Sequence, residues 1–147
     1  MSENGISKPA SKPLPPASEA TRPFWAAAAE GRFVVQRCTA CGHLRFPPGP
    51  ACTRCLSAGA EWVPLSGRGT VLSHLVFHQA YSKAWAGEVP YSVVMVQLDE
   101  GPRLFSDVVD PERAFVEADL VGRRVEAVFD RLAEDVAVPR FRVSEPG

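Results

Sequence analysis

Short apolar segments separated by polar turns fill the second half of the sequence. They are rich in Val, Leu and Phe, and the turns between them hold Gly, Pro, Asp or Glu, a pattern typical of β-strands. Residues 79–90 are predicted to form a longer loop and residues 110–119 a short helical turn. Because five strands in about 75 residues must protect their edges, we expect a partly closed barrel, of which the OB fold is the commonest five-stranded version. The predicted strands are residues 69–78, 91–98, 103–109, 125–129 and 138–143.

A different pattern precedes the barrel. Residues 21–31 are predicted to form one short helix, because a capping Thr and an early Pro begin this segment and Gly31 ends it. A free helix of this length is barely stable, so it should dock through Phe24 and Trp25, either on its own chain or on a partner. Three short strands are predicted after it, at residues 33–37, 43–46 and 61–65.

The first twenty residues have the composition of a flexible arm. Four prolines lie among Ser, Ala and Lys, and the few large aliphatic side chains cannot offset the entropy lost on ordering. The predicted organisation is therefore a Pro-rich arm at residues 1–20, a helix with a cysteine module at residues 21–66, and a barrel at residues 67–147.

Four cysteines provide the strongest chemical signal. Cys38 and Cys41 form one C-x2-C pair, and Cys52 and Cys55 form a second pair ten residues later. Two such knuckles joined by strands are typical of a closed, tetrahedral four-sulfur site, in which zinc has a structural role. Iron binds the same thiolates and remains the alternative metal.

Composition and charge narrow the function classes. The chain has 147 residues and a net charge of −1; residues 1–68 contain 8 Lys and Arg against 4 Asp and Glu, whereas residues 69–147 contain 8 against 13. The first residues hold no apolar stretch typical of a secretory signal, and no apolar run is long enough to span a bilayer. We therefore expect a cytoplasmic protein with no membrane partner, in which metal binding is favoured over disulfides.

No catalytic motif is recognisable. The sequence contains no G-x-S-x-G elbow, no phosphate-binding glycine loop and no H-E-x-x-H, and its cysteines are assigned to the metal. We therefore predict no catalytic residue and favour a binding or scaffolding protein over an enzyme. A zinc ribbon with an OB barrel also suggests nucleic-acid binding, but the acidic second half argues against a phosphate-tracking groove.

An ordered series of motifs resembles the rubredoxin-like zinc-ribbon/OB-fold family whose members accompany thiolase-like acyl-CoA enzymes. The resemblance covers residues 21–143. It rests on Phe24-Trp25, Gly31, Gln36-Arg37-Cys38-x2-Cys41-Gly42, Phe46-Pro47-Pro48, Cys52-x2-Cys55, Trp62-Val63, Ser66-Gly67-x-Gly69, Pro90-Tyr91, Val96-x-Leu98-Asp99-Glu100-Gly101-x-Arg103 and Gly122-x-x-Val125.

The resemblance implies a mainly β fold with a short N-terminal helix, a zinc ribbon and a C-terminal five-stranded OB barrel. It also implies a non-catalytic subunit that binds a thiolase-like enzyme and helps to hold acyl-CoA. In one branch of the family the complex is a retro-aldolase that cleaves steroid side-chain acyl-CoA thioesters. In others it bridges acetoacetyl-CoA thiolase and hydroxymethylglutaryl-CoA synthase, or serves acyl transfer. We favour the steroid branch for this short chain.

Contact residues are predicted from residue type and position alone. Phe24 and Trp25 are either interface anchors or core residues. Tyr81 and Trp85 lie in the predicted loop and suit a partner surface, an adenine ring, or packing against the barrel. Two cations, Lys83 and Arg103, are predicted to contact CoA phosphates. A homodimer within a hetero-oligomer could use either the barrel edge or the helix, and the sequence does not decide between them.

Overall fold

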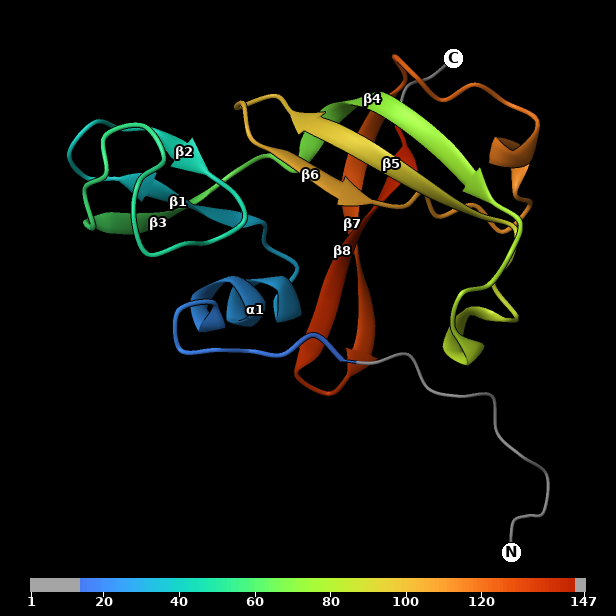
Figure 1. Ribbon diagram of the computed structural model, residues 1–147, viewed down its shortest axis with the longest axis horizontal. Coiled ribbons are helices and arrows are strands. Elements are labelled where there is room, and N and C mark those ends of the chain that lie inside the picture. Colours follow the sequence, from blue (N-terminus) through green and yellow to red (C-terminus); the bar gives the residue numbers. More distant parts are fainter. Residues whose placement is uncertain (1–13, 145–147) are drawn as a thin grey trace, which may run out of the picture.

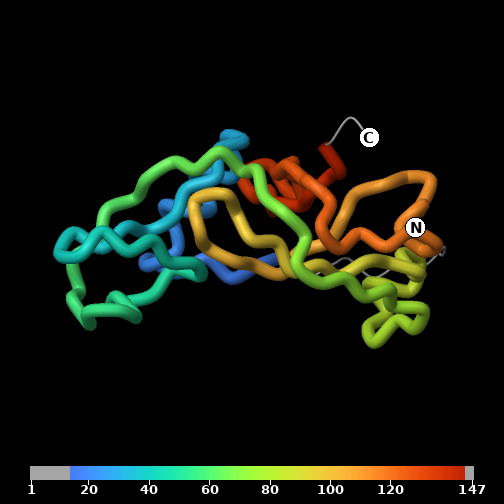
Figure 2. Tube along the Cα trace, turned by 90° about the horizontal axis from the view of Figure 1, so that it is seen from above, coloured from blue at the N-terminus to red at the C-terminus, as the bar shows by residue number. Residues whose placement is uncertain are grey.

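The computed structural model describes residues 14–144, so most of the predicted arm lies outside the described residues. Within this range the chain forms one α-helix, a three-stranded sheet and a curled five-stranded sheet (Figure 1). The metal-ligand loops of the small sheet and the loop at residues 79–90 lie at opposite ends of an elongated molecule (Figure 2). The predicted mainly β fold class is confirmed.

Helix α1 spans Arg22–Ala29, close to the predicted range. Gly31 has φ +78° and donates its N–H to Ala28 O, while the N–H of Arg32 reaches Ala27 O, both at 2.9 Å. These two bonds form the glycine-terminated end expected from the sequence. The predicted cap at Thr21 is wrong in detail, because its side chain makes no capping bond and instead bonds Ser18.

The small sheet has the order β2–β1–β3, with β1 (Val34–Cys38), β2 (Leu44–Arg45) and β3 (Ala60–Pro64) all antiparallel. Strand β1 is buried at four of its five positions and packs on α1, whereas β3 is mostly half-buried or exposed. Strand β2 is two residues shorter than predicted, because Phe46 begins the Pro-rich loop. The long loop from β2 to β3 carries the second cysteine pair.

The large sheet has the order β6–β5–β4–β7–β8. Its strands are β4 (Arg68–Phe77), β5 (Tyr91–Leu98), β6 (Arg103–Ser106), β7 (Arg124–Ala133) and β8 (Val136–Val143). Short 3-10 turns follow β4 and β6, at Lys83–Trp85 (η1) and Ala114–Val116 (η2). The five predicted strands are confirmed, and the curled sheet is a half-barrel.

The half-barrel departs from the sequence prediction at two places. The predicted strand 103–109 ends at Ser106, because the chain then leaves β5 and forms a bridge from Val108 to Phe141 that draws β8 toward β6. Strands β7 and β8 are longer than predicted and form one continuous hairpin, in which Asp130 pairs with Val138 in register. Asp130 is an internal position of this hairpin, where its side chain accepts from Arg140 Nη1 at 3.1 Å.

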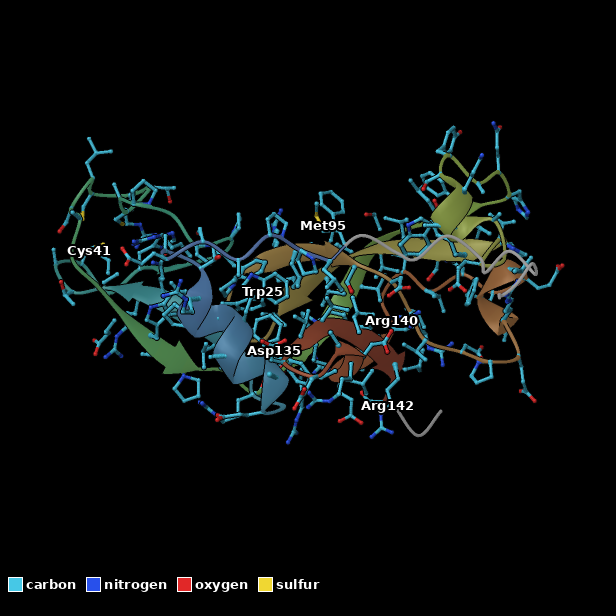
Figure 3. The ribbon with its side chains drawn as sticks, turned by 90° about the horizontal axis from the view of Figure 1, so that it is seen from below. Trp25, Cys41, Met95, Asp135, Arg140 and Arg142 are labelled. Carbon is cyan, nitrogen blue, oxygen red and sulfur yellow. The ribbon has the colours of Figure 1, made fainter. Side chains whose placement is uncertain are left out.

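One continuous core joins the three parts. Phe24 of α1 and the β1-side residues Phe33 and Val35 pack in the same cluster as the inner side chains of the half-barrel. The tip of the β7–β8 hairpin, where Asp135 lies, reaches α1 (Figure 3), and Arg131 donates to Ala29 O at 2.7 Å. The helix therefore docks on its own chain. The half-barrel contributes Val71, Val94, Val96, Leu98, Leu104, Val108, Phe115, Leu120, Val125 and Phe141 to this core.

Candidate metal centre and contact residues

The four cysteines converge on one point. Their sulfurs all lie within 4.8 Å of one another, with Cys38 Sγ 3.5 Å from Cys55 Sγ and Cys41 Sγ 3.6 Å from Cys52 Sγ. Zinc–sulfur bonds of about 2.3 Å in a tetrahedron place the sulfurs about 3.8 Å apart. The spacing therefore fits a four-thiolate zinc site.

The two knuckles have the same backbone geometry. In the first, Gly42 donates to Cys38 O and Cys38 donates to His43 O, both at 2.9 Å. In the second, Leu56 donates to Cys52 O at 2.9 Å and Cys52 donates to Ser57 O at 2.8 Å. Both Gly42 and Leu56 have positive φ, at 80° and 67°. Leu56 is not among the residues predicted from the sequence, although its position after the second C-x2-C pair matches that of Gly42.

Backbone N–H groups point at the sulfurs that lie deepest. Ala40 donates to Cys38 Sγ at 3.4 Å, and Arg54 and Cys55 donate to Cys52 Sγ at 3.3 and 3.4 Å. The backbone N–H of Cys41, with smaller help from that of Ala40, lowers the pKa of Cys38 to about 6. The N–H of Cys55 lowers the pKa of Cys52 in the same way. Both groups are thereby prepared as thiolates, the form that binds metal.

Cys55 shows why a cation belongs at this site. The backbone N–H of Ser57 lowers the pKa of Cys55. The Cys38 thiol, burial, and the thiols of Cys41 and Cys52 together outweigh this and raise the pKa to about 12. Four thiolates crowded within hydrogen-bonding distance oppose one another's ionisation, and a divalent cation removes that opposition. Protein sulfurs fill all four tetrahedral positions, so the arrangement supports a structural zinc with no open position for substrate.

A buried polar lock holds the loop beside this centre. Gln36 Oε1 accepts from Arg45 Nε at 3.0 Å and from the N–H of Gly49 at 2.8 Å, and Arg45 also donates to Gly49 O at 3.0 Å. Both side chains are buried. These bonds tie β1, β2 and the Pro-rich loop together.

The predicted interface anchors of the helix occupy different environments. Phe24 is buried and packs its ring against Phe33 and Phe46, with ring centres 5.9 and 5.3 Å apart. Trp25 is half-buried beside it, at 4.9 Å. The alternative of a core position thus describes Phe24, whereas Trp25 keeps part of its ring at the surface.

The loop between β4 and β5 packs against the half-barrel through its aromatic rings. Trp85 lies 5.1 Å from Tyr91, and Tyr81 lies 5.9 Å from Phe77. Tyr81 nevertheless remains 74% exposed. The loop therefore packs against its own barrel, as one of the predicted alternatives states, and it still presents the exposed ring of Tyr81 at the surface.

The two predicted CoA contacts lie far apart. Lys83 begins the turn η1 near the start of β5, whereas Arg103 pairs with Gln97 at the other end of that strand (Figure 1). The six residue steps from Tyr91 to Gln97 span about 20 Å, so these cations cannot contact the same phosphate group. Arg103 instead lines a groove of about 820 Å³ between the ribbon and the β5–β6 turn, together with Arg45 and Arg54.

Fold and site together define a class of protein, namely a zinc ribbon joined to an OB-fold half-barrel. Residues 25–61 match the rubredoxin-like zinc ribbon domain of ChsH2, and residues 62–130 match the C-terminal OB-fold domain of ChsH2. The chain therefore belongs to the ChsH2 family of DUF35 proteins, which accompanies thiolase-like enzymes.

Three relatives illustrate the range of this family. A "Probable enoyl-CoA hydratase alpha subunit" of Thermomonospora curvata is 37% identical over 134 residues, which cover 89% of this chain and 40% of the relative. A "3-oxo-4,17-pregnadiene-20-carboxyl-CoA hydratase alpha subunit" of Mycobacterium tuberculosis is 36% identical and is covered over 32% of its length. A "DUF35 domain-containing scaffold protein" of Methanocaldococcus jannaschii is 36% identical over 67% of this chain and 68% of its own. The chain thus spans less than half of the two hydratase subunits.

A solved structure matches over nearly its whole length. The structure is described as an "Ltp2-ChsH2(DUF35) aldolase"; the match has a TM-score of 0.73 and 34% identity, and it covers 88% of this chain and 98% of the other. Among residues 14–144, no helix has the length and apolar character needed to cross a membrane.

Proposed function

We propose that this chain is a non-catalytic accessory subunit of a thiolase-like acyl-CoA complex, in which it helps to assemble the complex and to hold acyl-CoA. The observation that carries the proposal is the nearly full-length likeness to the ChsH2 chain of an aldolase complex. The site chemistry agrees, because the reactive thiols of the chain are all placed at one closed metal centre.

Within this class we propose a retro-aldolase that cleaves steroid side-chain acyl-CoA thioesters. Support comes from the aldolase complex that matches in structure and from the relative that is a 3-oxo-4,17-pregnadiene-20-carboxyl-CoA hydratase alpha subunit. A bridging role between acetoacetyl-CoA thiolase and hydroxymethylglutaryl-CoA synthase is the second candidate, favoured by the archaeal relatives described as scaffold proteins.

The residues of this chain are suited to binding acyl-CoA rather than to catalysing its reaction. The zinc ribbon and the Gln36–Arg45–Gly49 lock fix the loop that forms one wall of the groove, and Arg54 and Arg103 present cations to it. Phosphate groups of CoA are the anions that such a groove would bind. We propose Arg103, rather than Lys83, as the contact with a CoA phosphate.

Co-expression with thiolase-like proteins tests the proposal. Each thiolase-like protein encoded in the source genome is expressed with and without this chain, and copurification, solubility and cleavage of steroid side-chain acyl-CoA substrates are measured. We expect one pair to copurify and to turn over substrate, with no turnover by this chain alone. Turnover by the isolated chain would contradict the accessory role. Copurification with both acetoacetyl-CoA thiolase and hydroxymethylglutaryl-CoA synthase would instead support the bridging role.

A further inference from the structure

We infer that the outer surface of strands β4, β5 and β6 is the face on which the thiolase-like subunit docks. This inference rests on the function proposed above and specifies where the partner binds. The face consists of six side chains, here called the apolar face: Leu75, Phe77, Tyr91, Val93, Met95 and Phe105.

Strand register places these side chains on one side of the sheet. Leu75 pairs with Val93, Phe77 with Tyr91, and Met95 with Phe105. Directly opposed residues in an antiparallel pair project to the same side. The alternate positions of β5, which are Ser92, Val94, Val96 and Leu98, are the buried ones, so the apolar face is the side turned away from the core. Figure 3 shows Met95 on the side of the molecule opposite Arg142.

The β4–β5 loop covers one end of this surface, where Trp85 packs on Tyr91, but the rest of it has no such cover from that loop. Phe105 is 69% exposed and Leu75 is 61% exposed, and Tyr81 extends the surface by packing its edge on Phe77. The outward side of an antiparallel sheet that faces water is normally polar. A contiguous exposed apolar patch of this kind marks an interaction site.

The exposed area is of the size that an interface needs. An aromatic side chain offers roughly 150–250 Å². Tyr81 and Phe105, at 74% and 69% exposure, therefore present about 200–350 Å² between them. One side of a standard interface contributes about 800 Å², so these two residues alone supply about a quarter of it or more.

A hollow beside the face can receive a partner side chain. A cavity of about 460 Å³ is lined by Tyr91 and Val93 and by Leu132 and Val138 of the β7–β8 hairpin. Its other lining residues include Pro15, Trp85 and the ion-paired group Asp107, Asp130 and Arg140. Cavities lined in this way accept the aromatic or aliphatic anchors that dominate interface energetics.

The charges around the apolar face favour a different protein subunit over an oligonucleotide or a second copy of this chain. Strands β5 and β6 are the OB positions that bind oligonucleotides in other proteins, but the apolar face itself carries no cation, and Lys83 and Arg103 lie only at its two ends. A second copy of this chain would bring two half-barrels together whose sequence, residues 69–147, has 13 acidic against 8 basic residues. An uncharged, apolar surface of a different subunit fits best.

Substitutions on the face provide the test. The double variant Leu75→Asp/Phe105→Asp charges the apolar face on both strands that flank β5, and Val121→Asp charges an exposed apolar residue in the turn before β7 as a matched control. Zinc content and circular dichroism confirm folding of each variant. Affinity for the thiolase-like subunit that copurifies with the wild-type chain is measured by titration calorimetry. We expect the double variant to lose about 100-fold or more in affinity, and the control to bind as the wild type does.

The other outcomes overturn the inference in distinguishable ways. Equal binding by all three proteins would place the interface elsewhere while leaving the proposed function intact. Failure of the wild-type chain to bind any thiolase-like subunit would remove the proposed function, and the inference with it. In sedimentation, a wild-type dimer that the double variant abolishes, with partner binding unchanged, would assign the face to a second copy. Salt-dependent binding of an oligo-dT probe that the double variant loses would assign the face to nucleic acid.

Discussion

The zinc ribbon and the half-barrel differ in what fills their interiors. The largest fully buried side chains of the ribbon are Val35 and two metal-ligand cysteines, whereas the half-barrel buries Phe141, Leu98 and four valines to the same extent. Burial of apolar area stabilises the half-barrel at any metal concentration. The ribbon buries too little apolar area in its own interior to be stabilised in this way, so its stability depends on the metal ion. The difference predicts that the two regions respond to different perturbations.

Metal removal should give the largest effect. Structural zinc in small ribbons contributes about 10–16 kcal/mol at neutral pH, so a strong chelator or the substitution Cys52→Ser should unfold residues 33–65. The strands of the half-barrel should persist because their core is apolar. Hydrogen exchange resolved by segment measures both regions, and elemental analysis should find one zinc per chain.

His43→Ala serves as the control for this experiment. His43 follows the first knuckle directly, and its backbone carbonyl accepts from Cys38. Four thiolates already complete the site, so this variant should keep its zinc. Unchanged protection of residues 33–65 after complete metal removal would contradict the dependence of the ribbon on metal.

A core substitution should give the second largest effect, with the opposite regional pattern. Phe141 is fully buried in β8, where it pairs with Ala127 and bridges to Val108. Phe141→Ala should lower the free energy of unfolding by about 3–5 kcal/mol, measured by denaturant titration of the zinc-loaded protein.

Phe105→Ala is the matched control, since it makes the same substitution on the opposite side of the sheet. Phe105 is 69% exposed, and its loss should change the free energy of unfolding by less than about 0.5 kcal/mol. Equal losses for the two variants would show that the outer face contributes to the core, against the assignment of that face to docking.

The two knuckles allow a finer comparison inside the ribbon. Leu56 adopts the left-handed conformation that costs a residue with a side chain about 1–2 kcal/mol relative to Gly. Because Leu56 is 80% exposed, Leu56→Gly should lose little burial and raise the free energy of unfolding by about 1 kcal/mol. Denaturant titration of the zinc-loaded protein measures this gain.

Gly42→Ala is the reciprocal variant. A Cβ at Gly42 would meet no atom within 4 Å, so only the backbone conformation is tested. The substitution should lower the free energy of unfolding by about 1 kcal/mol. A gain in stability for Gly42→Ala would contradict the shared geometry of the two knuckles.

The metal centre could be predicted from the local spacing of the cysteines. The contact surfaces could not, because they depend on which strands pair in the folded chain. The C-x2-C pairs identify Cys38, Cys41, Cys52 and Cys55 as one set without reference to the remainder of the chain. The apolar segment Tyr91–Leu98 predicts a strand, but both of its sides are apolar, so the sequence does not reveal which side meets the core.

Distances between residues that are far apart in the chain could not be predicted from the sequence either. Lys83 and Arg103 are both cations near turns, and only the strand order shows that they lie at opposite ends of β5. Phe24 is core rather than surface because its ring packs on Phe33 and Phe46 and because α1 packs against the β7–β8 hairpin, which lies about a hundred residues later in the chain.

The smallest expected effect concerns a histidine on the inner side of β4. His74 pairs with buried Val94, and its Nε2 is buried with no hydrogen-bond partner among the described residues. Burial lowers the pKa of His74 below 6.5, and the charge of Asp119 opposes this only in part. The unfolded chain therefore binds the proton more readily, and the free energy of unfolding should fall as pH drops through about 6.5.

His74→Gln should flatten this fall between pH 7.5 and 6, measured by denaturant titration with zinc present. His78→Gln, at an exposed position just beyond β4, controls for the loss of a histidine. A steeper fall in the His74 variant than in the wild type would mean that the folded half-barrel favours the imidazolium, contrary to its apolar interior.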